Sequence, residues 1–286
     1  MATQTIVTGF TGLNGQNVGT FVDVLRSGSA LAQVTAASGG QVLTNLDFRD
    51  HRLPVVTRTT LPAKYSEGAT RTSADSTTTT AALQVAIYDD WNPISVEFER
   101  TTDPAALVST VVDASAALFP LVFDIEYLGA IAAGASATSV EYNAADPIAS
   151  FSSLLAKYDT TTYGATGMVL TRAGTRKLGL ATTASDKALQ FPSGVQSLWN
   201  GPLFQTGATG TQLGVATVMA IVGPFHAGVW GANQGMTTER RPDATVDSQG
   251  PGTGMVQYLN RAAMGYVNGI DTAGNGNGFS VLIDAS

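Results

Sequence analysis

Residues 94–134 read ISVEFERTTDPAALVSTVVDASAALFPLVFDIEYLGAIAAG, and they hold the clearest periodic patterns in the sequence. The first seven residues alternate, with Ile94, Val96 and Phe98 on one face and polar residues on the other. Alternation with a period of two predicts a half-buried β-strand. A strand is therefore expected over residues 94–100.

A long helix is predicted directly after this strand. Asp103 is a suitable N-cap, and Pro104 suits the first helical position. Apolar residues keep helical spacing from there to Gly134, which is a natural stop. At about 1.5 Å per residue, roughly 30 residues span about 45 Å, which is longer than most globular helices. Pro120 lies inside the pattern and predicts a kink.

Residues 53–100 predict a long two-stranded hairpin upstream of the helix. Residues 53–59 form the outgoing strand and residues 83–88 the return, followed by a break over residues 89–93. The polar segment 70–80 has no apolar side chain larger than Ala, so it cannot pack a core. A hairpin of this kind is poorly stable alone and needs a neighbour.

Residues 1–52 are rich in glycine and carry only short apolar groups. Only residues 21–31 suit a turn or two of helix. The segment has little core of its own, and its backbone needs hydrogen-bond partners. We therefore expect an extended arm that lies on something else.

The chain after the long helix predicts a mixture of short helices and strands. Helices are expected at residues 146–158 and 173–180, with a strand at 168–170 between them. The last third alternates short strands with glycine-rich turns. The strands expected there are residues 215–222, 227–230, 255–259, 262–267 and 279–283. This order of elements predicts an α+β fold.

Charged residues make up only 13% of the chain, about half the usual share. Either the surface is rich in Thr, Ser and Asn, or much of it is buried against partners. Interface cores are depleted in charge, which favours a subunit of a large assembly. The net charge is −7, with no basic stripe of the kind that nucleic-acid-binding proteins show. A container for DNA, in contrast, gains from a lining that does not stick to its contents.

Several classes of protein are excluded by what the sequence lacks. Without cysteine there are no disulfides and no thiolate metal sites. The N-terminus lacks the positive start and apolar run of a signal peptide. The richest apolar stretch, residues 118–133, is interrupted by Pro120, Asp124 and Glu126, which argues against a membrane span. A soluble protein that is not exported is expected.

The sequence contains no motif for catalysis or cofactor binding. A phosphate-binding Gly-Lys-Ser/Thr loop and a nucleophile elbow are both missing. His51 and His226 have no partners at metal-ligand spacing. The loop at residues 271–278 lacks the spacing and the closing glutamate of a calcium site. We expect no catalytic, cofactor-binding or metal-binding residues, and therefore no enzyme.

Two charged pairs are candidate sites. Asp124 and Glu126 are two apart on a helix and do not face each other, so solvent-exposed or intersubunit charges are expected. Arg240 and Arg241 could touch a phosphate, although solvation or a salt bridge to a neighbouring subunit is favoured.

The order of elements resembles that of the major capsid proteins of tailed bacteriophages, the Hong Kong ninety-seven type. Residues 64–68 (KYSEG) resemble the aromatic-x-Glu-Gly passage of that family's extended loop. Residues 94–103 resemble its transition from a strand into the long spine helix. Residues 220–225 (AIVGPF) and 260–267 (NRAAMGYV) resemble its closing strands, although a proline replaces the aspartate of the common Gly-Asp-Phe.

The resemblance implies a division of the chain into named parts. These are an N-terminal arm at residues 1–52, an extended loop at 53–100, a peripheral domain with the spine helix at 101–189, an axial domain at about 190–260, and closing strands of the peripheral domain at 261–286. In this family such a loop lies across the adjacent subunit. Intersubunit contacts are therefore expected in the loop at Lys64, Glu67 and Arg71. Outside the loop they are expected at Arg240 and Arg241, from the charge argument given above.

The resemblance also implies a function. It indicates a structural protein that self-assembles into pentamers and hexamers, forming an icosahedral head around double-stranded DNA without reading its sequence. The expected place is the virion, assembled in the host cytoplasm without contact with a membrane. A separate scaffolding protein, a portal and a decoration protein are candidate partners. The alternative is an encapsulin-like nanocompartment shell, but residues 1–20 do not resemble its cargo-docking helix.

Overall fold

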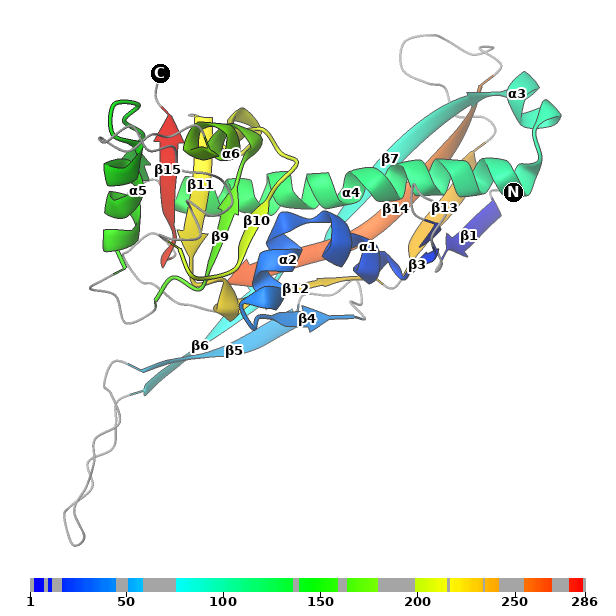
Figure 1. Cartoon of the computed structure of the whole chain (residues 1–286). Coiled ribbons are helices and arrows are strands. Elements are labelled where there is room, and N and C mark those ends of the chain that lie inside the picture. The colour runs from blue at the N-terminus through cyan, green and yellow to red at the C-terminus, as the bar shows by residue number, and fades with distance from the viewer. Residues whose placement is uncertain are drawn as a thin grey trace, which may run out of the picture.

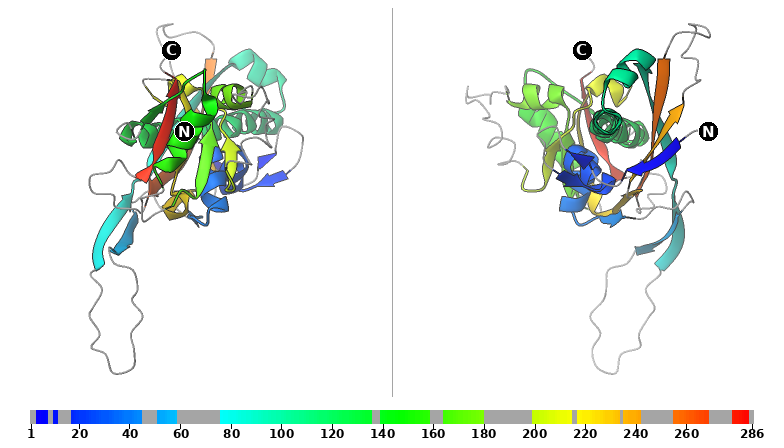
Figure 2. Two further views of the ribbon diagram at one scale, coloured as in Figure 1. Left: turned by 60° about the vertical axis from the view of Figure 1, so that its left-hand side comes forward. Right: turned by 90° about the vertical axis from the view of Figure 1, so that its right-hand side faces the viewer.

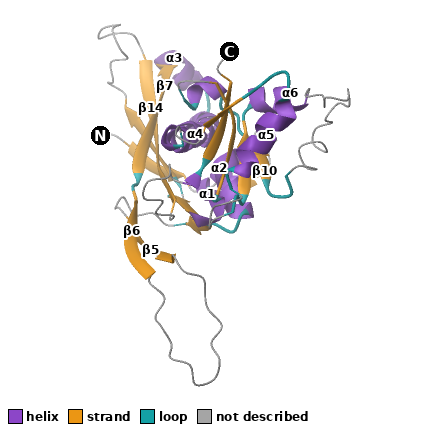
Figure 3. Ribbon diagram, turned by 90° about the vertical axis from the view of Figure 1, so that its left-hand side faces the viewer, coloured by secondary structure: helices purple, strands orange, loops and turns teal. Residues whose placement is uncertain are grey.

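The structure is a computed structural model of the whole chain, shown in Figure 1. It describes residues 3–7, 10–11, 17–44, 51–58, 76–135, 139–158, 164–179, 199–214, 217–233, 235–241, 255–268 and 278–284. The long helix α4 (Pro104–Gly134) runs through the middle of the molecule. Views close to its axis show α4 between two β-sheets (the right-hand view of Figure 2, and Figure 3).

The first sheet is built around the 14-residue strand β14. Along one side β14 pairs with β7, antiparallel, over ten residues; along the other it pairs with β13 and then with β12. Strands β1 and β4 extend the sheet beyond β13 and β12. The bounds are β1 Thr3–Val7, β4 Gln41–Leu43, β7 Ala86–Ser95, β12 Gly228–Ala232, β13 Met236–Arg241 and β14 Met255–Asn268.

The second sheet has the order β10-β9-β11-β15-β8. Its strands are β8 Ser139–Glu141, β9 Gly167–Leu170, β10 Leu203–Gln205, β11 Thr217–Gly223 and β15 Ser280–Asp284. Helices α5 (Pro147–Ala156) and α6 (Arg172–Gly179) pack on it, and the short 3-10 helices η2 (Gly210–Gln212) and η3 (Phe225–Ala227) flank β11. The predicted segment 190–260 therefore contributes strands to both sheets.

The N-terminal segment is more ordered than an extended arm. Helices α1 (Phe21–Gly28) and α2 (Ala30–Ala37) pack against α4, and their apolar residues belong to the main core. Phe21 is fully buried and meets Phe119 of α4 edge-on at 5.6 Å. A Cβ at Gly28 would lie 2.8 Å from the ring of Pro120. The expectation that residues 1–52 form an extended arm is therefore wrong for residues 21–37, which are helical and pack against α4.

The hairpin is confirmed as strands β5 (His51–Arg58) and β6 (Ser76–Leu83), which pair antiparallel from His51 opposite Leu83 to Arg58 opposite Ser76. It projects away from the two sheets (Figure 1). The return strand begins earlier than expected, since residues 76–80 of the predicted polar tip lie in β6. A second, small hairpin joins β2 (Phe10–Thr11) and β3 (Asn17–Gly19).

The strand predicted at residues 94–100 is wrong beyond Ser95. Val96–Thr101 forms a short helix, α3, because the Ser95 hydroxyl accepts a hydrogen bond from the Phe98 amide and caps it. Phe98 is consequently 54% exposed. The expected break at residues 89–93 is also absent, because β7 runs through it. Among the described residues β7 pairs with β14 alone, so it is an edge strand, where Pro93 is tolerated.

Helix α4 keeps its predicted start and stop. The Asp103 side chain accepts from the Ala105 amide, Pro104 opens the helix, and it ends at Gly134. By length and composition α4 could cross a membrane, but 44% of its most apolar window is buried inside the molecule. Phe123 is fully buried and packs edge-on against Trp230 of β12 at 6.0 Å. These contacts identify α4 as the core helix of the fold.

Replacing Phe123 by Ala should lower the free energy of unfolding by about 3–5 kcal/mol, because it leaves a cavity beside Trp230. The matched control is Leu118→Ala on the same helix, where the side chain is 54% exposed; it should change stability by no more than about 0.5 kcal/mol. Urea unfolding of the purified subunit measures both. Equal losses for the two variants would contradict this packing.

Candidate functional site

A salt bridge ties α3 to the first sheet. Arg240 of β13 donates from Nε and Nη2 to the two carboxylate oxygens of Glu99, at 2.5 and 2.6 Å. The Tyr258 hydroxyl of β14 donates to the same carboxylate at 2.6 Å. These bonds lower the pKa of Glu99 to about 2, with the Arg240 guanidinium the largest cause, and the carboxylate raises the pKa of Arg240.

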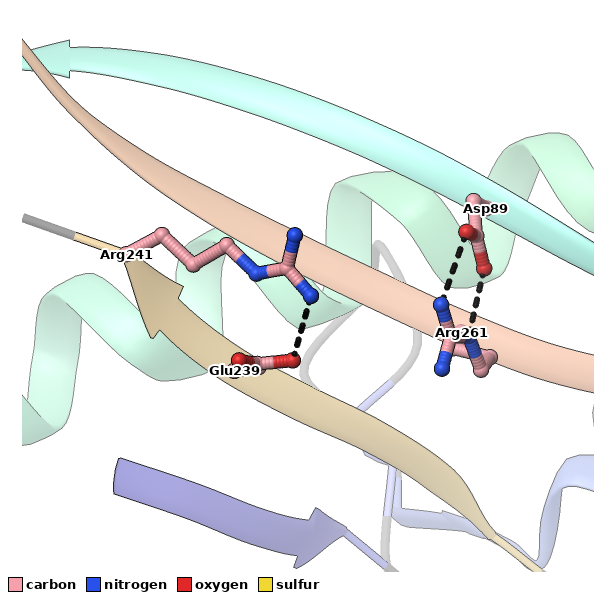
Figure 4. Close-up of polar contacts among 4 residues, drawn as sticks. All are labelled: Asp89, Glu239, Arg241 and Arg261. Carbon is pink, nitrogen blue, oxygen red and sulfur yellow. Dashed lines mark hydrogen bonds and ion pairs between the residues drawn. The ribbon is translucent and has the colours of Figure 1, made fainter. Parts of the chain in front are cut away.

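Two further ion pairs lie on the same sheet (Figure 4). Arg261 of β14 donates to Asp89, its register partner on β7, at 2.7 and 3.0 Å. This pairing lowers the pKa of Asp89. Arg241 donates to Glu239 at 3.1 Å, and its guanidinium lies 5.1 Å from the ring centre of Trp91. The two acidic and two basic side chains balance in charge across three strands.

The outer sheet face is the surface of β7, β14 and β13 that carries Asp89, Arg261, Glu239 and Arg241. Side chains alternate along a strand, so Ile87 and Trp91 lie on the face that carries Asp89. Ile87 is 52% exposed and Trp91 43% exposed. A surface that combines apolar area with an aromatic ring and arginine has the composition of a protein interface.

The inner face of the same sheet is joined to α4 by a polar network. The Ser115 hydroxyl of α4 donates to Asp90 at 2.6 Å and accepts from the Asn260 amide at 2.6 Å. The Asn260 carbonyl accepts from the Thr238 hydroxyl at 2.8 Å, and the Asn92 amide donates to Asp90 at 3.0 Å. The network fixes the register of three strands against the helix, because a slip would leave these groups unpaired.

Asp124 is a buried carboxylate further along α4. It accepts four hydrogen bonds, two from hydroxyls and two from backbone amides. The donors are the Ser29 hydroxyl at 2.5 Å, the Thr206 hydroxyl at 2.6 Å, and the Ala30 and Leu31 amides at 3.0 and 3.1 Å. Burial raises the pKa of Asp124, and the four bonds partly offset that effect.

The expectation for Asp124 is therefore wrong, since it is 1% exposed and its carboxylate binds groups of its own chain. The carboxylate stabilises the N-terminus of α2, where free amides favour a negative charge. It also holds the loop after β10 in place through Thr206. Glu126 is exposed, as expected.

The predicted contact residues fall into two groups. Lys64, Glu67 and Arg71 lie outside the described residues. Arg240 and Arg241 both have partners within the chain, so their expected contact with a neighbouring subunit stays a prediction. Sequence reasoning missed the partners of both arginines and the whole Asp89–Arg261 pair. The neighbouring Asp89 and Asp90 were the available signal, but which strand residues they face depends on the register with β14.

His226 has a polar neighbour within the part of the chain that the structure describes. His226 Nδ1 lies 3.2 Å from the Thr166 hydroxyl. Among the described residues, no group of three or more His, Asp or Glu side chains could hold a metal ion.

No protein-family model matches the sequence, and no curated protein matches it. Solved structures do match. A chain from Mycobacterium phage Bobi superposes with a TM-score of 0.63 at 15% identity, covering 91% of each chain. One from Microbacterium phage Oxtober96 gives 0.62 at 14% identity, covering 90% of this chain and 91% of the other. The capsid of a native GTA particle gives 0.52 at 13% identity, covering 88% of this chain and 91% of the other.

The chain has the Hong Kong ninety-seven-type capsid fold. The match covers nearly all of both chains, so the whole fold is shared rather than one motif. The α+β capsid fold expected from the sequence is confirmed.

Glu99→Gln should lower the free energy of unfolding at pH 7 by about 1–2 kcal/mol, because it removes a charged partner of Arg240. The Arg240 guanidinium lowers the pKa of the Glu99 carboxyl from its ordinary value of 4.5 to about 2 in the folded protein. Its contribution is therefore full above pH 4.5 and is lost as pH falls toward 2. In urea unfolding measured from pH 7 to pH 3, the difference in free energy of unfolding between Glu99→Gln and the wild type should become smaller as the pH falls. The control is Glu97→Gln, which is exposed on the same helix and should unfold almost like the wild type. A difference for Glu99→Gln that does not change with pH would contradict the pairing.

Asp124→Ala should cost about 3–5 kcal/mol, because it leaves four buried donors without an acceptor. Glu126→Ala, two residues along the same helix, should cost no more than about 0.5 kcal/mol. Thermal or urea unfolding distinguishes the two. The account of this carboxylate fails if both variants unfold alike.

Proposed function

We propose that the protein is the major capsid protein of a tailed phage or a related particle. Subunits assemble into pentamers and hexamers, which close into an icosahedral head around double-stranded DNA. The observation that supports this most is a fold shared over about nine-tenths of the chain with phage structures and with the capsid of a GTA particle. The role is structural rather than enzymatic.

An encapsulin-like nanocompartment shell is not favoured. The structures reported above come from phages and from a GTA capsid. The proposed location is the virion, with assembly in the host cytoplasm. A scaffolding protein, a portal and a decoration protein are proposed as further partners, and DNA is enclosed without recognition of its sequence.

The parts of the subunit are proposed as follows. Residues 1–52 correspond to the N-terminal arm and residues 53–100 to the extended loop. Helix α4 and the first sheet form the peripheral domain. The second sheet with α5 and α6 is proposed to contribute to the axial domain, which the resemblance places at about residues 190–260. The sheet pairing supports this division because, among the described residues, the strands of each sheet pair only with strands of the same sheet.

Light scattering after gel filtration tests the proposed assembly. Purified protein, alone or with its scaffold, should elute as particles far heavier than the 29.5 kDa subunit. The proposal is wrong if a compact monomer is the only species at every concentration and with scaffold present.

The charges of the extended loop supply a second test. Lys64, Glu67 and Arg71 are the only charged residues between Arg58 and Asp75. Each exposed ion pair contributes only about 0–1 kcal/mol, but a shell repeats every contact many times. Glu67→Ala with Arg71→Ala should leave the subunit folded and lower particle yield or heat resistance. Circular dichroism of the subunit and melting of the particles measure the two effects, and particles that form and melt as wild type would remove these charges from the account.

A further inference from the structure

A pocket of about 330 Å³ lies between α6 and η2 on the second sheet. Among the described residues, its lining consists of Arg172, Ala173 and Arg176 from α6, and Thr209 and Gly210 from the η2 turn. None of these side chains is acidic. The two arginines are the only charged groups among them.

Both walls of the pocket are fixed to β11 by glycines. A Cβ at Gly174 of α6 would lie 2.0 Å from the Met219 carbonyl oxygen, and one at Gly210 would lie 2.4 Å from the Val218 carbonyl oxygen. The backbones of α6 and η2 thus approach two consecutive residues of one strand. The Thr171 hydroxyl reinforces this by donating to the Val218 carbonyl at 2.8 Å. The pocket is therefore held by rigid elements before anything binds.

The helix geometry directs both arginines away from β11. Arg172 and Arg176 each lie two residues from Gly174, about 200° around the helix, and four residues from each other. They consequently share one face, with Cβ atoms about 5–6 Å apart. Both are exposed, and within the described part of the chain neither forms an ion pair or a side-chain hydrogen bond. The next cation, Lys177, is paired with Asp284.

We propose that Arg172 and Arg176 form a phosphate-binding site in this pocket. Two guanidinium groups on one face match the tetrahedral oxygens of a phosphate, which they bind through paired, charge-assisted hydrogen bonds. Three of the chain's 15 basic residues lie in the eight residues of α6, with no acidic residue among them. Although the chain as a whole has a net charge of −7, this cluster of basic residues attracts an anion locally.

Two sources supply such a group: free inorganic phosphate and the backbone of nucleic acid. The second rests on the proposed function, because a shell places its subunits against enclosed DNA. The site itself does not depend on assembly.

The test uses the full-length purified subunit and a double variant, Arg172→Gln with Arg176→Gln. The control is Arg26→Gln with Arg100→Gln, which removes the same charge from exposed positions on α1 and α3. Calorimetric titration with inorganic phosphate should show binding weakened about tenfold or more in the pocket variant and hardly changed in the control. All proteins should melt at the same temperature, since the replaced side chains are exposed.

A second arm uses a short DNA duplex over a range of salt concentrations. If DNA is a source, the slope of log affinity against log salt should become shallower in the pocket variant, by about one for each phosphate that it no longer binds. Weakened binding of inorganic phosphate with an unchanged DNA slope identifies free phosphate as the ligand. Equal behaviour of the pocket and control variants toward both probes overturns the site. A subunit that binds phosphate through this pair but never forms particles contradicts the proposed function and leaves the site standing.

Discussion

The burial of α4 is the constraint on which the rest of the structure depends. The helix carries apolar residues around most of its circumference and no basic residue, so it is stable only when other elements cover it. The first sheet, the second sheet and the N-terminal helices each cover part of it (Figures 2 and 3). Together they form one core from residues that are far apart in sequence.

Polar contacts at two places along α4 select a single arrangement from the many that apolar packing alone would allow. In its first half, Ser115 joins the helix to β7 and β14 through Asp90 and Asn260. In its second half, Asp124 holds the N-terminus of α2. A buried polar group without a hydrogen-bond partner costs free energy, so these contacts fix both the sheet register and the position of the N-terminal helices on α4.

The elements that the sequence predicts well are those whose signals are local. The cap at Asp103, the helical period and Gly134 define α4 to within a residue, and Asp146 defines the start of α5 in the same way. Helix α3 was missed because Ser95 caps it and its alternating apolar residues imitate a strand. The N-terminal helices were underestimated because their core is supplied by α4. The role of Asp124 was out of reach, since its donors lie more than 80 residues away along the chain.

Contacts of the outer sheet face and of the extended loop are also out of reach of the sequence, because they depend on residues that are not local. Arg240 and Arg241 were singled out by residue type, whereas their partners depend on strand register and on α3.

A cryo-electron microscopy reconstruction of purified particles tests the central claim most directly. It should show closed shells with rings of five and six subunits, α4 as the spine of each subunit, and the β5–β6 hairpin lying over an adjacent subunit. Particles that are absent, or a hairpin that contacts only its own chain, would contradict the account.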